Sequence, residues 1–369
     1  MGLLERLAAL VSFDTQNPEG DEKPLVHELG RELSALGAAA VDEVEVGNHA
    51  YVYARFGGER PTLLLNAHVD TVPANSGYSS PPHILVRRGE RLHGLGAADT
   101  KGAIAAILEA LAGRATPAAG EPAGQPTVGV LFSGDEERSG TCIRAFLDSE
   151  VARGLTHAIV CEPTGCRVGV RHRGIAAATA TVEGPGGHSS RVDGLVNPIA
   201  VLARAAVALD DWGAAERARG PAGFEGLCLN VASLDGGLAF NVVPTRATLS
   251  VSLRPAPGAD VVALMAEAER RVRAAAAPHS VAWTVEMQNP PFATRALGAF
   301  ARFLGAAAEH AVDLGFWTEA ARLSERGIDA VVYGPGLVEQ AHAADEHVDI
   351  AQLESARATF THVLEAAAR

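Results

Sequence analysis

Four short, almost uninterrupted apolar runs constrain the fold of this chain more than any other feature. They are TLLLNAH (62–68), VGVLF (128–132), HAIVC (157–161) and DAVVYG (329–334). Each run has the length of one buried strand, and stretches with helical spacing lie between several of them. Strands that are apolar on both sides and alternate with helices are typical of a sheet covered on both faces. The sequence therefore predicts an α/β domain with three layers, α/β/α.

The pattern changes between residues 174 and 287. Its apolar and polar residues alternate at 175–184, 227–237, 246–255 and 280–287, and helical spacing occurs at 197–210 and 259–276. Such alternation is typical of an antiparallel sheet with one exposed face. Four strands and two helices predict a compact α+β, ferredoxin-like insert of the split βαβ type. We therefore predict a larger domain formed by 1–173 and 288–369, which a smaller domain at 174–287 interrupts.

Other elements of the larger domain follow from the same periodicities. Helices are expected at 2–13, 25–36, 99–113, 296–313 and 350–366, and paired strands at 41–46 and 49–56. The stretch ATPAAGEPAGQPT (115–127) is rich in Ala, Pro and Gly, which indicates an exposed loop without chemistry.

Composition limits the partners. The net charge of −13 argues against nucleic acid or an acidic membrane surface as partner, and it also fits a protein that holds divalent cations through carboxylates. No stretch approaches the ~20 apolar residues that a membrane span needs. The four cysteines show neither CxxC spacing nor a disulfide framework, so we expect a reducing, cytoplasmic location.

Acidic and imidazole side chains follow the predicted strands where these end. They are His68, Asp99, Glu136, Glu137, Glu162 and His342. In open α/β sheets the carboxyl ends of the strands form the ligand crevice. Two histidines and three carboxylates, one of them shared, match two divalent ions with nitrogen and oxygen ligands. The histidines indicate zinc, with cobalt or manganese as substitutes, rather than magnesium or calcium.

Adjacent Glu136 and Glu137 are the most informative pair. Neighbouring side chains in a loop diverge, so one can bind metal while the other acts as a general base. Asp70, two residues after His68, can hold the far nitrogen of that imidazole and fix its tautomer. Each feature also has a simpler interpretation: an ordinary strand end, a helix N-cap at Asp99, or a solvated pair of glutamates. Their joint placement at successive strand ends favours the metal site.

Eight motifs along the chain resemble, in order, those of the co-catalytic zinc aminoacylase and deacylase family. They are LVSFDTQNPEG, NAHVDTVP, GLGAADTKGAIAA, FSGDEERSG, CEPT, GGHSS, NVVP and AHAADEHV. The family includes acetylornithine deacetylases, succinyl-diaminopimelate desuccinylases, carboxypeptidases of the glutamate type and dipeptidases. The resemblance implies a zinc-exopeptidase-like catalytic domain and an inserted domain that forms a homodimer.

The resemblance also implies roles for the candidate ligands. His68 and Glu162 would bind one metal, Glu137 and His342 the other, and Asp99 would bridge both. Glu136 matches the family's catalytic base, and Asp70 matches its histidine-orienting aspartate.

Further residues acquire roles only through the resemblance. His188 would reach the active site of the neighbouring subunit and stabilise the tetrahedral oxyanion. Asn241 and Arg254 would hold substrate oxygens, and Gly334 would line the pocket. Glu319 would meet a cationic or polar ω-group of the substrate; its simpler interpretation is a residue that opens a helix.

The stretches FWTEA (316–320) and YGPGLVEQAH (333–342) look most like acetylornithine and N-acetylcitrulline deacetylases. The resemblance implies removal of an acetyl group from an N-acetyl amino acid in arginine biosynthesis, with N-acetylornithine slightly ahead of N-acetylcitrulline. The alternatives are a dipeptidase or carboxypeptidase, a succinyl-diaminopimelate desuccinylase, and a non-catalytic binding homologue of the same fold.

Overall fold

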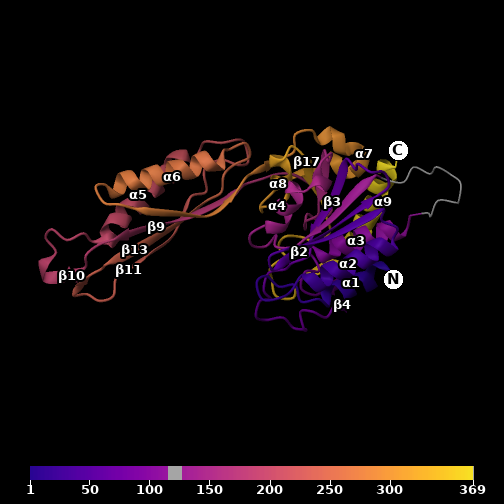
Figure 1. The fold of residues 1–369 in the computed structure, drawn as a ribbon, viewed down its shortest axis with the longest axis horizontal. Helices are drawn as coiled ribbons and strands as arrows, with labels where there is room; N and C mark the ends of the chain where they lie inside the picture. The colour runs from indigo at the N-terminus through magenta and orange to yellow at the C-terminus, as the bar shows by residue number, and fades with distance from the viewer. Residues whose placement is uncertain (115–126, 369) are drawn as a thin grey trace. The chain divides into compact units, whose positions relative to one another are not determined.

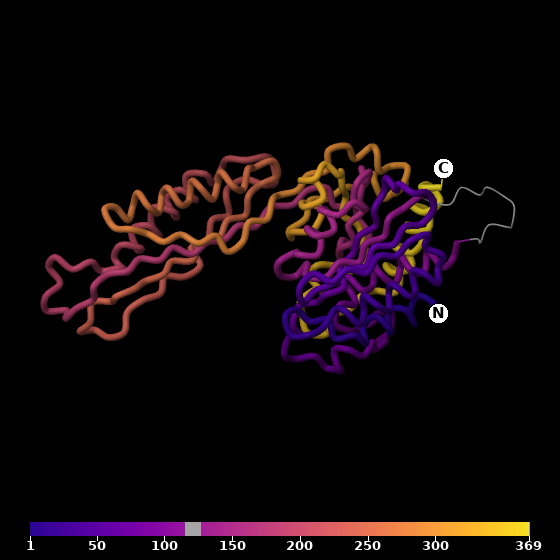
Figure 2. Tube along the Cα trace, viewed as in Figure 1, coloured from indigo at the N-terminus to yellow at the C-terminus, as the bar shows by residue number. Residues whose placement is uncertain are grey.

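The chain folds into two compact units. The computed structural model describes residues 1–114 and 127–368, so the loop expected at 115–127 lies, apart from Thr127, outside the described residues. The first unit comprises Met1–Val170, Thr294–Leu314 and Thr318–Arg369, and the second comprises Arg171–Ala293 and Gly315–Trp317. The beginning and the end of the chain thus belong to the same unit, as the indigo and yellow segments show (Figures 1 and 2).

A mixed sheet forms the centre of the first unit. Its strands, in spatial order, are β1 (Ala40–Val46), β2 (His49–Phe56), β6 (Val128–Ser133), β3 (Leu63–His68), β7 (His157–Val160), β17 (Asp329–Val332) and β8 (Val168–His172), and β16 (Ala311–Leu314) also pairs with β8. β3 runs parallel to β6 and β7, and all six of its residues are buried. This burial explains its unbroken apolar run.

Helices cover both faces of this sheet. They are α1 (Leu3–Val11), α2 (Lys23–Ala35), α3 (Lys101–Ala112), α4 (Thr141–Asp148), α7 (Ala301–Leu304), α8 (Ala320–Glu325) and α9 (Ile350–Ala367). One core cluster joins α1, α2, α3 and α9 to Leu63 and Leu65 of β3. On the other face, Phe146 of α4 packs against Tyr51 and Tyr53 of β2. The predicted three-layer α/β/α class is confirmed.

A small sheet joins the C-terminal part of the chain to an early loop of the first unit. Its strands are β18 (His347–Asp349), β5 (Arg91–His93) and β4 (Val86–Arg88). Antiparallel pairing places His347 opposite His93. This ladder brings the segment after His342 to the loop that precedes α3.

The second unit is an antiparallel sheet with two helices. Its strands lie in the order β11 (Asn230–Gly236), β13 (Arg246–Leu253), β9 (Ile175–Glu183), β14 (Ala282–Asn289), and its helices are α5 (Pro198–Glu216) and α6 (Val261–Ala276). Alternate residues of β9 and β13 are buried in one core with these helices. The connectivity βαββαβ is that of the expected split βαβ insert.

Two short pairings complete the second unit. β10 (Gly187–His188) and β12 (Val242–Val243) form a two-stranded ribbon. β15 (Phe292–Ala293) pairs with Arg171 and His172, the last two residues of β8.

The prediction of one helix at 296–313 is wrong. The structure has a 3₁₀ turn at Leu297–Phe300, the short α7, a second 3₁₀ turn at Gly305–Glu309 and then β16. Gly305 adopts a positive φ of 51°, which a right-handed helix cannot accommodate. Helical spacing alone did not reveal this break.

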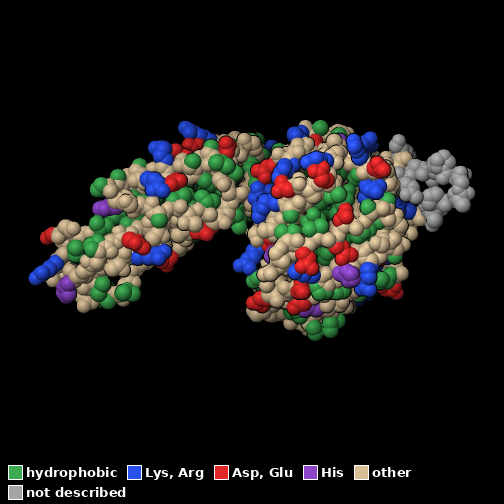
Figure 3. Space-filling view, viewed as in Figure 1, with side chains coloured by type: hydrophobic (Ala, Val, Ile, Leu, Met, Phe, Trp, Pro, Cys, Tyr) green, Lys and Arg blue, Asp and Glu red, His purple; other side chains and the backbone are tan. Residues whose placement is uncertain are grey.

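None of the described helices is both long and apolar enough to cross a membrane. On the face shown in Figure 3, basic and acidic side chains are interspersed over both units.

Candidate metal centre

The strands of the first unit deliver the candidate ligands to the sheet's carboxyl edge. His68 is the last residue of β3, Glu137 follows β6, and Glu162 follows β7. Asp99 precedes α3 by two residues, and its peptide bond to Thr100 is cis. His342 lies in the loop after β17 with a φ of 58°. Parallel strands end at the same edge, so residues far apart in the sequence meet there.

The carboxylate of Asp99 lies between the two histidines. Its Oδ1 is 3.0 Å from Nε2 of His68, and its Oδ2 is 3.3 Å from Nε2 of His342. Nε2 of His342 is also 2.9 Å from Oε1 of Glu137. One ligand atom each from His68, Asp99 and Glu137 lie within 4.8 Å of one another. Each oxygen of Asp99 therefore faces a different histidine, which is the arrangement that a bridging carboxylate requires.

The buried carboxylates of this ligand set favour the binding of cations. Burial raises the pKa of Glu162 well above its usual value, and the carboxylates of Asp99 and Glu136 raise it further. Within the described parts of the chain, no hydrogen-bond donor reaches the side chain of Glu162, which is 5% exposed. A buried acid without a donor is costly unless a cation compensates it. The donor set of imidazoles and carboxylates suits zinc or a similar divalent ion.

The histidines are drawn towards their charged form by the same acids. Hydrogen bonds to Asp99 and Glu137 raise the pKa of His342 to about 10. Burial lowers the pKa of His68, but the neighbouring carboxylates of Asp70 and Asp99 outweigh it and leave that pKa well above its usual value. Protons therefore occupy, in part, the places that metal ions would take.

Asp70 orients the neighbouring residues, although not with the atom that the sequence suggested. Nδ1 of His68 is 2.9 Å from the main-chain oxygen of Asp70 and 3.6 Å from its Oδ1. The carboxylate instead accepts the main-chain N–H groups of Glu136 and Glu137, each at 3.1 Å. Asp70 thus fixes the His68 ring mainly through its carbonyl and fixes the two glutamates through its side chain.

Glu136 is placed beside the ligands but is not hydrogen-bonded to them. Among residues 1–114 and 127–368, no hydrogen-bond partner of its carboxylate is found, and burial raises its pKa well above the usual value. The negative charges of Glu137, Glu319 and Asp70 act in the same direction. A carboxylate without a hydrogen-bond partner beside a candidate metal site is free to accept a proton from a water molecule.

The carboxylate of Glu319 is buried near the candidate base Glu136, whose pKa its negative charge raises. The residue is 1% exposed, directly precedes α8, and accepts a hydrogen bond of 2.7 Å from the Ser133 hydroxyl. Burial raises its pKa to about 7. Its Oε2 contacts the end of β6, and its Oε1 has no hydrogen-bond partner among the described residues, so its contact with an ω-group stays a prediction.

Gly334 is also a packing position. Its N–H donates to Thr164 Oγ1 at 3.1 Å, and its carbonyl accepts from Cys166 N at 2.8 Å. A Cβ at this position would lie 2.7 Å from the main-chain oxygen of Glu162. The residue is therefore glycine because the Glu162 segment passes so close, and its role in lining a pocket is not needed to explain it.

His188, Asn241 and Arg254 lie in the second unit, whereas the candidate metal ligands lie in the first. β10–β12 pairing places His188 opposite Val242, and the N–H of Ser189 donates to the Asn241 carbonyl at 3.0 Å. The side chains of His188, Asn241 and Arg254 are exposed. They are thus available for contacts, and their predicted roles stay predictions.

Sequence reasoning missed Glu346. Its buried carboxylate accepts the main-chain N–H groups of Gly96, Ala98 and Asp99. The only signal was its place in the motif AHAADEHV, four residues after His342.

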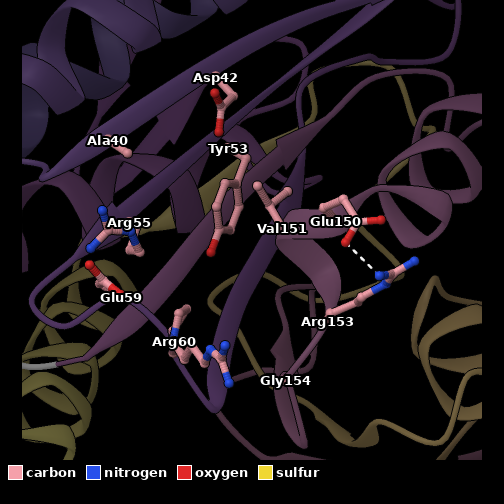
Figure 4. Close-up of a pocket in the computed structure, with 11 residues that line it drawn as sticks. Ala40, Asp42, Tyr53, Arg55, Glu59, Arg60, Glu150, Val151, Arg153 and Gly154 are labelled. Atoms are coloured by element: carbon pink, nitrogen blue, oxygen red, sulfur yellow. Dashed lines mark ion pairs between the residues drawn. The ribbon is translucent and has the colours of Figure 1, made fainter.

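A cavity of about 500 Å³ lies at the other edge of the same sheet (Figure 4). Tyr53 and Arg55 of β2, Arg60 before β3, and the ion pair of Glu150 with Arg153 line it. It lies near the amino end of β3, whereas His68 ends that strand. The cavity contains none of the candidate ligands.

Comparison with known proteins assigns the chain to a family. Residues 64–366 match the model described as peptidase family M20/M25/M40. The chain is 36% identical to an N-acetyl-L-citrulline deacetylase of Xanthomonas campestris pv. campestris, over 95% of this chain and 94% of that protein. It is 30% identical to an acetylornithine deacetylase of Myxococcus xanthus (97% and 95%) and 34% identical to a succinyl-diaminopimelate desuccinylase of Methylobacterium sp. (strain 4-46) (85% and 83%).

Solved structures share the fold. An M20 family metallo-carboxypeptidase from Sulfolobus solfataricus matches with a TM-score of 0.78 at 17% identity, over 99% of both chains. A dinuclear metal-binding peptidase of Bacillus subtilis matches with a TM-score of 0.71 at 17% identity, over 98% of both chains.

Metal binding should release protons. A ligating imidazole must be neutral, yet the pKa of His342 in the metal-free protein is about 10, so below that pH the ring loses a proton when an ion binds. The apparent affinity for Zn²⁺ should then rise by about tenfold per pH unit for each proton released. Competition titrations with a chelator at pH 6, 7 and 8 measure this slope. An affinity that does not change over this range would contradict the assignment of His342 as a ligand.

Proposed function

The chain belongs to peptidase family M20/M25/M40, and we propose that it removes the acetyl group from the α-nitrogen of an N-acetyl amino acid. It is a hydrolase of amide bonds. The observation that carries the proposal is the near full-length similarity to an N-acetyl-L-citrulline deacetylase, together with the ligand cluster around Asp99. The similarity to an acetylornithine deacetylase supports the same bond and the same kind of substrate.

Five residues would hold the two ions: His68 and Glu162 on one side, Glu137 and His342 on the other, and Asp99 between them. The distances from the two oxygens of Asp99 to the two imidazoles support this division. When bound, two zinc-like ions would polarise the amide carbonyl and lower the pKa of the attacking water.

Glu136 is the proposed general base. Asp70 holds its main-chain N–H, so the backbone is fixed while the carboxylate stays free of hydrogen bonds to the described residues. Its carboxylate would take a proton from the attacking water and return it to the leaving amine.

The second unit would supply the contacts to the substrate. The exposed guanidinium of Arg254 suits the α-carboxylate, because its planar fork makes two charge-assisted hydrogen bonds. Asn241 would hold a further substrate oxygen. His188 would stabilise the oxyanion from a neighbouring subunit.

The similarity to the two deacetylases orders the candidate substrates. The Xanthomonas relative, an N-acetyl-L-citrulline deacetylase, is 36% identical to this chain, and the Myxococcus relative, an acetylornithine deacetylase, is 30% identical. We therefore propose N-acetylcitrulline ahead of N-acetylornithine, with a place in arginine biosynthesis.

The four free cysteines fit a reducing, cytoplasmic location.

A succinyl-diaminopimelate desuccinylase is the second candidate. It is supported by 34% identity over 85% of the chain. The two activities differ in the acyl group that the pocket must hold, and both would use the same base and ligands.

A substrate panel tests the proposal. We expect zinc- or cobalt-loaded enzyme to hydrolyse N-acetylcitrulline with a higher kcat/KM than N-acetylornithine, N-succinyl-diaminopimelate or dipeptides.

The matched variant Glu136→Gln should retain both metal ions but lose turnover by roughly 10²–10⁴-fold, because the amide cannot accept the proton. Preference for the succinylated substrate would favour the second candidate, and full turnover by Glu136→Gln would remove Glu136 as the base.

Dimerisation through the second unit is proposed from an exposed apolar surface. Leu238 and Phe240 are 92% and 109% exposed, and Val192 is 52% exposed. Hydrophobic side chains are visible at the end of the unit that carries β10 (Figure 3). Large apolar side chains gathered on one surface often mark an interface between proteins, and a two-fold contact is the commonest one. His188 and Asn241 are sequence neighbours of these residues.

Mixing two inactive variants tests this dimer. His188→Ala should lack the oxyanion contact, and Glu136→Gln should lack the base. After unfolding and joint refolding, a hybrid dimer would contain one complete site, so equal amounts should recover about one quarter of wild-type activity. No recovery, or a fully active wild-type monomer in sedimentation, would rule out a shared site.

A further inference from the structure

Glu346 joins two segments that carry candidate metal ligands. It lies four residues after His342 and directly before β18, and only 2% of its surface is exposed. The pairing of β18 with β5 fixes its position, because His347 lies opposite His93. Neither its burial nor its charge is needed for the proposed chemistry, so its position requires another explanation.

The carboxylate of Glu346 accepts three main-chain hydrogen bonds from the loop before α3. Oε2 accepts the N–H of Gly96 at 2.9 Å, and Oε1 accepts those of Ala98 and Asp99 at 2.9 and 3.1 Å. The main-chain oxygen of Glu346 adds a fourth bond, from the N–H of Gly94 at 3.0 Å. Glu346 therefore accepts four of the main-chain N–H groups between Gly94 and Asp99.

A carboxylate is the side chain that this loop requires. Buried N–H groups are almost always paired, and here three of them converge on two oxygens. Glutamine has the same shape but only one acceptor oxygen, so its NH₂ group would face at least one of these N–H groups. The loop would have to shift to relieve that contact.

The loop is held from its other side by the end of β3. The hydroxyl of Thr100 donates to the main-chain oxygen of His68 at 2.8 Å. Asp99 is thus fixed between the His68 backbone and the Glu346 carboxylate, and its own two oxygens remain directed to His68 and His342.

We propose that Glu346 is a positioning residue for Asp99, which sets the bridging carboxylate at the correct place before any metal ion binds. Because Glu346 and His342 share one short segment, the same contact also ties the His342 ligand to Asp99. This inference rests on the proposed metal centre. Positioning residues of this kind typically change metal affinity by about 10- to 100-fold when they are replaced.

Cobalt titration of metal-free protein tests the proposal. The variants are Glu346→Gln and, as a matched control, Glu354→Gln, which removes an exposed carboxylate paired with Arg357 on α9. Wild type and Glu354→Gln should bind two Co²⁺ per chain with the same visible spectrum. Glu346→Gln should bind at least one of the two ions about 10- to 100-fold more weakly and with an altered spectrum.

Two outcomes would overturn this inference alone. One is a Glu346→Gln protein with wild-type Co²⁺ affinities and spectrum, whatever its melting temperature. The other needs no variant: in metal-free wild type, the amides of Ala98 and Asp99 should exchange slowly with solvent, and fast exchange would show that the carboxylate does not hold them. A wild type that binds no Co²⁺ would overturn the metal centre itself, and this inference with it.

Discussion

The rest of the site depends on the contacts of the Asp99 carboxylate with two imidazoles. The carboxylate faces His68 with one oxygen and His342 with the other. Around it the fold gathers further acids whose pKa burial raises, including Glu136 and Glu162. So many acidic groups in a buried place are unfavourable without cations, because desolvation and mutual repulsion add up. Bound cations would compensate these buried carboxylates, and without cations their charges would lower the stability of the fold.

Acids near the candidate site include two kinds that differ in what they contact. Asp99 and Glu137 contact the histidines, and the charge of Glu162 acts on His68. Asp70 and Glu346 instead accept main-chain N–H groups, of Glu136 and Glu137 in one case and of the loop up to Asp99 in the other. The second kind would hold the backbone of the first, so that the ligands need little rearrangement when ions bind.

Much of the fold could be predicted from the sequence, and so could the meeting of His68, Asp99, Glu137 and His342 at one place. The apolar run at 62–68 is β3, and the alternation after residue 174 is the antiparallel sheet of the second unit, because burial on one or two faces leaves a direct pattern. The ends of the predicted strands indicated His68, Glu137 and His342, which lie close to Asp99 in the structure.

The rest depends on contacts that have no periodicity. Gly305 ends a helix that its neighbours favour, and Glu319 is buried with a hydrogen bond from Ser133. Glu346 acts on a loop some 250 residues earlier. Nothing near these residues in the sequence indicates their partners, and the direction of a loop side chain is set by tertiary packing alone.

The most direct test of the account is a crystal structure of the protein grown with zinc, with anomalous data collected on both sides of the zinc absorption edge. The account predicts two zinc peaks in the first unit, one at His68 and Glu162 and one at Glu137 and His342, with one oxygen of Asp99 bound to each. A single peak that Asp99 does not touch, or zinc bound away from these five residues, would contradict it.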